Sequence, residues 1–149
     1  IQLLIVGAGR DLENMKRRIV ELHLEEKVKV LPRMSYSELK KLTQRVHLGV
    51  SLDKPLHLNY TLSLPNKLFD YIHAGVPVLV SNLIEPARIV NEFQVGEIVE
   101  DVTPKSIAKG IEKILNSPSY VSYRDATKKA KSALHWQADF DKIDFSNFS

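Results

Sequence analysis

The chain has 149 residues, a formal net charge of +3 and no cysteine, which excludes a disulfide framework, a thiolate metal site and a cysteine nucleophile. Hydrophobic residues make up 44% of the chain and charged residues 26%, as is typical of a single folded domain rather than a disordered or fibrous chain. No apolar run approaches the roughly 18 residues of a membrane span, and no signal-peptide pattern opens the chain, so we expect a cytoplasmic protein. Basic residues occur in short clusters along the chain, but no aromatic residues lie between them. No nucleic-acid partner is therefore expected.

Strands and helices are predicted to alternate along the chain. The apolar run at residues 1–6 predicts a buried parallel strand, and apolar residues spaced by three and four predict a helix at 11–25. Because residue 1 stands inside the apolar run, we expect the chain to be a piece of a longer protein. The same patterns predict the remaining elements in chain order: strand 28–31, helix 35–46, strand 47–52, helix 65–75, strand 76–80, helix 86–93, strand 95–99, helix 104–115 and helix 119–135.

Two helix boundaries are predicted from specific side chains. Ser35 and Glu38 have the spacing of a capping box ahead of the second helix. Pro65 is expected in the first turn of the helix that Gly75 ends, because proline suits a helix start and glycine a helix end. Together these patterns predict an α/β fold, a Rossmann-like, doubly wound parallel sheet in one domain over residues 1–149.

In such a sheet ligands bind beyond the carboxyl ends of the strands, so the loops that follow the strands are the candidate sites. Gly7 and Gly9 follow the first strand and open like a dinucleotide fingerprint, but Leu12 stands where its third glycine should be. The two glycines indicate only that backbone can come close to a ligand or to another loop. The departure at Leu12 argues against a nicotinamide-dependent oxidoreductase.

The helix start at Leu64-Pro65-Asn66-Lys67 is a more specific candidate. A helix N-terminus attracts phosphate through its unpaired amides and its dipole, and Lys67 adds a positive charge. Asp70, one turn further along, could accept hydrogen bonds from a ribose diol. The alternative is a helix that merely begins with proline and ends with glycine.

Neither His73 nor the acidic residues of this region are interpreted as catalytic or metal-binding. His73, near the end of the same helix, is predicted to cap that helix rather than to catalyse. No metal site is expected, because Asp53 and Asp70 lie on separate elements and no histidine or carboxylate spacing resembles a ligand set.

Four segments carry a resemblance to a known family. They are LLIVGAG at 3–9, V-x-VL at 28–31, SEL at 37–39 and LPNKLFDYIHAGVPVL at 64–79. In order and spacing they are similar to the C-terminal half of GT-B glycosyltransferases, most of all the retaining family 4 enzymes, also called glycosyl transferases group 1. The resemblance implies a hexosyltransferase domain that binds a nucleotide diphosphate sugar for transfer to an acceptor in polysaccharide or glycolipid biosynthesis.

The resemblance also implies what this chain lacks. The N-terminal acceptor domain and the first strand-helix segment of the donor domain are absent, so we expect this fragment to be inactive alone and to have that N-terminal domain as its partner. The absence of cysteine fits a reducing, cytoplasmic setting, and peripheral association with the inner face of the membrane is expected. No cofactor is implied, because the nucleotide diphosphate sugar is itself the donor substrate.

Carried onto this sequence, the resemblance places the donor site at Gly7, Gly9, Arg33, Leu64, Asn66, Lys67 and Asp70. Arg33 is expected to stack on or flank the base, and a plain surface arginine is the alternative. The family's Glu-x7-Glu pair places its second carboxylate at Asp70 and its first at Leu62, which cannot hydrogen-bond. No catalytic residue is therefore predicted in this chain. Two alternatives stay open: a sugar-nucleotide epimerase of the same architecture, and a non-catalytic binding domain that has lost its ligand. A test of nucleotide binding would distinguish the non-catalytic domain from the glycosyltransferase and from the epimerase.

Overall fold

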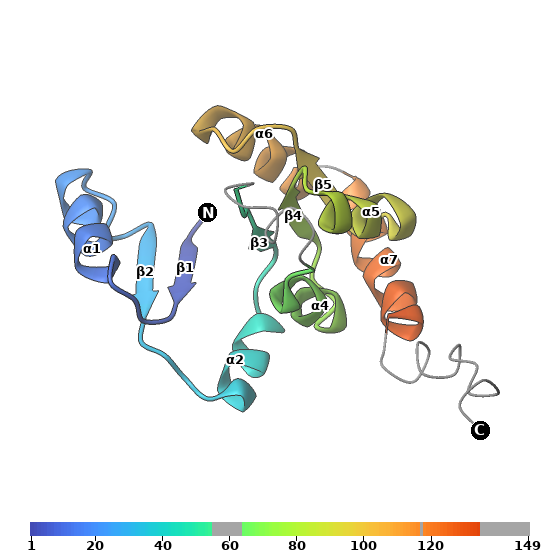
Figure 1. Ribbon diagram of the computed structural model, residues 1–149, viewed down its shortest axis with the longest axis horizontal. Coiled ribbons are helices and arrows are strands. Elements are labelled where there is room, and N and C mark those ends of the chain that lie inside the picture. The colour runs from blue at the N-terminus through green and yellow to red at the C-terminus, as the bar shows by residue number, and fades with distance from the viewer. Residues whose placement is uncertain (55–63, 117, 135–149) are drawn as a thin grey trace, which may run out of the picture. The chain divides into compact units, whose positions relative to one another are not determined.

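The structure is a computed structural model that describes residues 1–54, 64–116 and 118–134 (Figure 1). Parallel strands alternate with helices along the chain, which confirms the predicted α/β class. The chain divides into two compact units, Ile1–Leu39 and Lys40–Ser149. The prediction of one domain over residues 1–149 stays a prediction.

The first unit is built on two strands and a helix. β1 (Leu3–Val6) and β2 (Val28–Leu31) pair in parallel along their whole length, and α1 (Leu12–Glu21) connects them. The predicted helix end near residue 25 is wrong, because His23 takes a left-handed backbone conformation with φ of 52°. A non-glycine residue in that region cannot continue a right-handed helix. Helix α1 therefore ends at Glu21, before the chain reaches His23.

The predicted capping box at the start of α2 (Tyr36–Thr43) is confirmed. The backbone N–H of Ser35 donates to Glu38 Oε2 at 2.9 Å, and the N–H of Glu38 donates to Ser35 Oγ at 3.3 Å. These two bonds satisfy donors that a helix start otherwise leaves to water. The side-chain and backbone hydrogen bonds from Ser35 also lower the pKa of the Glu38 carboxyl below its ordinary value.

The second unit holds a three-stranded parallel sheet in the order β3-β4-β5. Its strands are β3 (Gly49–Ser51), β4 (Val78–Ser81) and β5 (Gly96–Val99). Its helices are α4 (Asn66–His73), α5 (Ile84–Phe93), α6 (Pro104–Leu115) and α7 (Ser119–Ala133). The predicted elements of this unit are therefore present, and no boundary differs from its prediction by more than two residues.

Helices cover both faces of this sheet, as a doubly wound fold requires. Val78 and Val80 of the central strand point into one core cluster, whereas Leu79 between them points into the other, because successive strand residues face opposite sides. The first cluster joins α4, α5 and α7 through Leu68, Ile72, Ile89, Val90 and Ala130. The second joins β5 and α6 through Val99 and Ile114.

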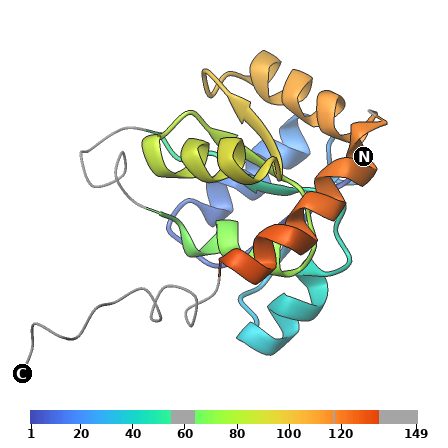
Figure 2. The ribbon, with the colours of Figure 1, turned by 90° about the vertical axis from the view of Figure 1, so that its right-hand side faces the viewer.

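Helix α7 runs across the unit from α6 towards α4, along the amino ends of the strands (Figure 2). The Tyr120 hydroxyl donates to the carbonyl of His47 at 3.1 Å, just before β3 begins. The Tyr123 hydroxyl donates to Glu97, near the start of β5. Helix α7 therefore does not cover the carboxyl ends of the strands, and the loops that follow the strands lie there.

The contact between Tyr123 and Glu97 predicts a pH dependence of stability. Burial, and then the Glu97 carboxylate, raise the pKa of Tyr123 from 10.0 to about 12. A raised tyrosine pKa contributes stability that is complete below pH 10 and is lost as the pH rises towards 12. We expect the free energy of unfolding, measured by urea titration, to fall across this range, and to fall less in Tyr123→Phe. A Tyr120→Phe control should keep the full decline; the same decline in Tyr123→Phe would contradict the assignment.

Candidate functional site

Three of the predicted site residues belong to the first unit. Gly7 and Gly9 follow β1 and Arg33 follows β2, so all three lie beyond the carboxyl ends of this parallel pair. The Gly7 N–H donates to the carbonyl of Leu31 at 3.2 Å, which joins the two strand ends. A Cβ built on Gly7 or Gly9 would meet nothing within 4 Å, and Arg33 is exposed. Packing within the described residues therefore requires neither glycine, although Gly7 has φ of 154°, a conformation that other residues rarely adopt.

The other four predicted residues lie at the start of α4 in the second unit. Pro65 precedes the helix as its N-cap residue, with ψ of 130°, so the prediction that it lies in the first turn is wrong. The proline ring fixes φ but leaves ψ free to be extended, and the helix begins at Asn66 instead. Among the described residues no side chain caps this start. The predicted helix end is confirmed, because Gly75 follows it with φ of 77°.

Side chains at this helix start differ in what they offer. Asn66 and Lys67 are exposed, and Asp70 is partly buried three residues after Lys67, on the same side of the helix. Leu64 is also partly buried and packs against the core cluster of α4 and β4. Leu64 thus belongs to the packing of the core, whereas Asn66 and Lys67 present polar groups at the surface.

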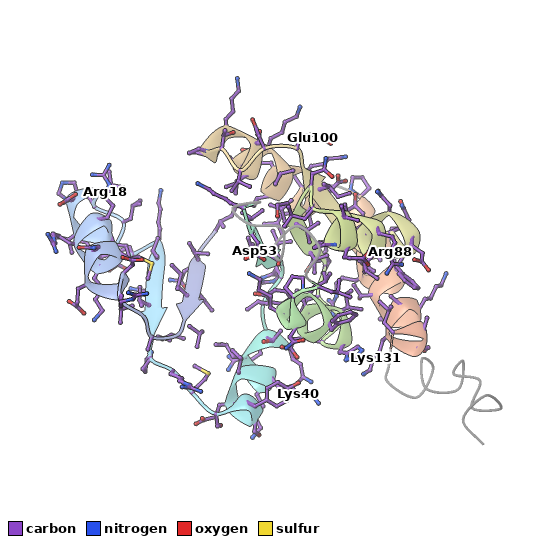
Figure 3. The ribbon with its side chains drawn as sticks, viewed as in Figure 1. Arg18, Lys40, Asp53, Arg88, Glu100 and Lys131 are labelled. Atoms are coloured by element: carbon purple, nitrogen blue, oxygen red, sulfur yellow. The ribbon has the colours of Figure 1, made fainter. Side chains whose placement is uncertain are left out.

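The structure adds a contact that sequence reasoning did not find. Lys67 Nζ lies 3.2 Å from both carboxylate oxygens of Asp53. Asp53 is the second residue after β3 and is labelled in Figure 3. The hydroxyl of Ser51, the last residue of β3, donates to Asp53 Oδ2 at 3.3 Å. The start of α4 is thereby linked to the carboxyl end of β3. The sequence does contain a signal for this contact. It is an acidic residue just after a strand, followed by a lysine at the start of the next helix.

The carboxyl ends of β4 and β5 carry further polar groups. Asn82 Nδ2 donates to Glu100 Oε2 at 2.7 Å, joining the ends of these two strands. The Ser81 side chain is only 3% exposed, and its Oγ has no hydrogen-bond partner among the described residues. A buried hydroxyl left unpaired costs about 1–3 kcal/mol, and such groups call for an explanation in function or in an ordered water. Polar groups therefore lie at the carboxyl ends of β4 and β5 as well as at that of β3.

His73 has a structural role, although not within its own helix. Its Nε2 donates to the carbonyl of Leu134 at 2.6 Å, and Leu134 is the residue that follows α7. The bond ties the end of α4 to the end of α7, on the amino side of the sheet. His73 therefore lies at the opposite end of α4 from Asn66 and Lys67.

A metal site, a membrane-spanning helix and the Leu62 position remain to be placed against the described residues. Over residues 1–54, 64–116 and 118–134, no three acidic or histidine side chains come together as a metal site. Over the same ranges, no helix has both the length and the apolar character needed to cross a bilayer. Leu62, at the first position of the Glu-x7-Glu spacing, lies outside the described residues.

The fold is similar to that of two solved structures. WaaG, a glycosyltransferase involved in lipopolysaccharide biosynthesis, matches with a TM-score of 0.67 and 16% identity, over 93% of this chain and 34% of its own. Sucrose-phosphate synthase from Thermosynechococcus elongatus matches with a TM-score of 0.72 and 16% identity, over 92% of this chain and 35% of its own. This chain thus spans about a third of the length of these proteins. No curated protein is similar enough in sequence to count as a match.

These likenesses confirm the predicted fold class, a Rossmann-like α/β fold of the GT-B glycosyltransferases. The family model described as "Glycosyl transferases group 1" matches residues 1–133. All seven predicted site residues fall inside the matched range. The chain therefore belongs to the glycosyl transferases group 1 family.

Proposed function

We propose that this chain is the donor-binding part of a glycosyltransferase and that it holds a nucleotide diphosphate sugar at the start of α4. The observation that carries the proposal is Lys67, exposed at a helix start that no described side chain caps. The backbone amides at the start of α4, the dipole of the helix and the Lys67 ammonium all favour an anion at that position. Asp70, on the same side of the helix, is proposed to accept from the ribose hydroxyls.

Glycosyl transfer breaks the bond between the sugar C1 and the diphosphate, so negative charge grows on the departing diphosphate. A positive group already in place stabilises this charge without reorganisation. In the proposed reaction, Lys67 and the amides of Asn66 and Lys67 do this work, and no metal or other cofactor is invoked. We also propose that Gly7, Gly9 and Arg33 contribute to the donor site, and this assignment is supported by family membership alone.

The whole reaction is proposed to require more than this chain. Because the chain spans about a third of the similar structures, we propose that an N-terminal domain of the same protein binds the acceptor and that this chain alone does not turn over. We further propose a retaining hexosyl transfer in polysaccharide or glycolipid biosynthesis, by a cytoplasmic enzyme that associates peripherally with the membrane. Membership of the family is what supports these finer proposals.

Calorimetric titration of the chain with UDP and GDP, with and without their sugars, tests the donor site. We expect one nucleotide diphosphate to bind more tightly than the other. Lys67→Ala should weaken it about tenfold or more, since a charge-assisted hydrogen bond contributes roughly 1.5–3 kcal/mol. Asp70→Ala should reduce the affinity for the nucleotide diphosphate more than the affinity for pyrophosphate, because Asp70 is assigned to the ribose and pyrophosphate has none.

The matched control is Lys128→Ala. Lys128 forms an exposed pair with Asp125 on α7, so this variant makes the same change of charge away from α4. Its affinity should equal that of the unaltered chain. Equal affinity of Lys67→Ala and Lys128→Ala, or no nucleotide binding by the folded chain at millimolar concentration, would overturn the proposed donor site.

A further inference from the structure

A three-residue relay links the buried end of β3 to the exposed start of α4. Ser51 is 2% exposed, and its hydroxyl donates to Asp53 Oδ2 at 3.3 Å. The Asp53 side chain is 30% exposed and that of Lys67 is 44% exposed, with 3.2 Å between Lys67 Nζ and each Asp53 carboxylate oxygen. Exposure rises along the relay from the sheet core to the solvent.

We propose that Asp53 is a positioning residue, which holds the Lys67 ammonium in place for the diphosphate of the donor. The inference rests on the proposed function, because it assumes that Lys67 contacts that diphosphate. A lysine has a long, flexible side chain, and its freedom must be lost when its ammonium binds an anion. A carboxylate that already holds the ammonium removes part of this loss before the ligand arrives.

The opposite role for Asp53 is that of an internal competitor, which neutralises Lys67 until the ligand displaces it. A competing carboxylate would have to move away when the diphosphate binds. Asp53 is instead held by Ser51, whose side chain is fixed in the buried end of β3. The anchor therefore favours positioning, and the two roles predict changes of opposite sign when the Asp53 charge is removed.

The test is titration of inorganic pyrophosphate, and of the tighter-binding nucleotide diphosphate, into Asp53→Asn. This substitution keeps the size of the side chain and removes its charge. We expect both ligands to bind about threefold to tenfold more weakly, a change within the usual range for coupled neighbours. Asp53→Glu, which keeps the carboxylate, should recover part of the affinity. Asp125→Asn, which removes the same charge beside Lys128 on α7, should change nothing.

A double-mutant cycle separates positioning from a general structural effect. In a Lys67→Ala background, Asp53→Asn should cause no further loss of affinity, because the side chain that Asp53 positions is gone. Equal or tighter binding by Asp53→Asn alone would overturn the inference, and so would an undiminished loss in the Lys67→Ala background.

Failure of the proposed function looks different in the same experiment. In that case Lys67→Ala binds as the unaltered chain does, or the folded chain binds neither ligand, and the role of Asp53 falls with it. If Lys67→Ala weakens binding and Asp53→Asn does not, the donor site stands and only the positioning role is overturned.

Discussion

Gly96→Ala is expected to destabilise the second unit strongly, because the added methyl group meets the backbone of the neighbouring strand. Gly96 lies opposite Val78 in the parallel ladder between β4 and β5. A Cβ on Gly96 would lie 1.8 Å from the Val78 carbonyl oxygen and 2.7 Å from its carbonyl carbon. Backbone atoms cannot rotate away as a side chain does, so β5 would have to separate from β4. The expected cost is about 3 kcal/mol or more, measured as the free energy of unfolding in urea.

Gly110→Ala is the matched control for this prediction. A Cβ on Gly110, inside α6, would meet the Leu79 Cδ1 at 2.7 Å and the Val99 Cγ1 at 3.2 Å. Both atoms are the far ends of side chains, and alanine is favoured over glycine in a helix by about 1 kcal/mol. The net change should therefore be small. Equal stability of Gly96→Ala and Gly110→Ala would contradict the backbone clash. Loss of the folded far-UV signal in Gly96→Ala alone would support it.

The order and type of the elements could be predicted because they depend on local pattern. The box of Ser35 and Glu38 and the stop at Gly75 are set by residues within one or two turns of each other. The end of α1 was missed because the left-handed residue there is His23 rather than a glycine. Nothing in the local sequence requires a histidine to take that conformation.

The candidate site could be predicted only where it is local. The helix start with Asn66, Lys67 and Asp70 was found because proline, helix and glycine stand next to one another in sequence. The pair of Lys67 with Asp53 spans 14 positions, and that of Asn82 with Glu100 spans 18. Such contacts depend on strand register and on how far each strand extends, which the local pattern does not define.

The glycines of the sheet illustrate the same limit. Gly49 and Gly96 stand in strands, where glycine has low propensity, so local sequence gave no reason for them. The structure gives one: each accommodates a close neighbour that lies 22 or 18 positions away, the Tyr71 ring and the Val78 backbone. For Gly49 that neighbour is on α4, so the residue bears on the proposed site as well as on the fold.

Gly49→Ala is expected to cost about 2 kcal/mol or more of unfolding free energy. A Cβ on Gly49 would lie 2.2–2.5 Å from three atoms of the Tyr71 ring. Tyr71 packs against the core cluster, and its burial raises the pKa of its hydroxyl, so the ring cannot turn into solvent without losing that packing. Relief would require α4 to move away from β3.

Because α4 carries Lys67 and β3 leads to Asp53, that movement should also lengthen their 3.2 Å contact and weaken pyrophosphate binding. The double variant Gly49→Ala/Tyr71→Ala isolates the cause. With the ring removed, the added methyl should have almost no effect on unfolding free energy, so the two changes should be strongly non-additive. Additive costs in urea titrations would instead mean that Gly49 is needed for the strand backbone and not for the ring of Tyr71.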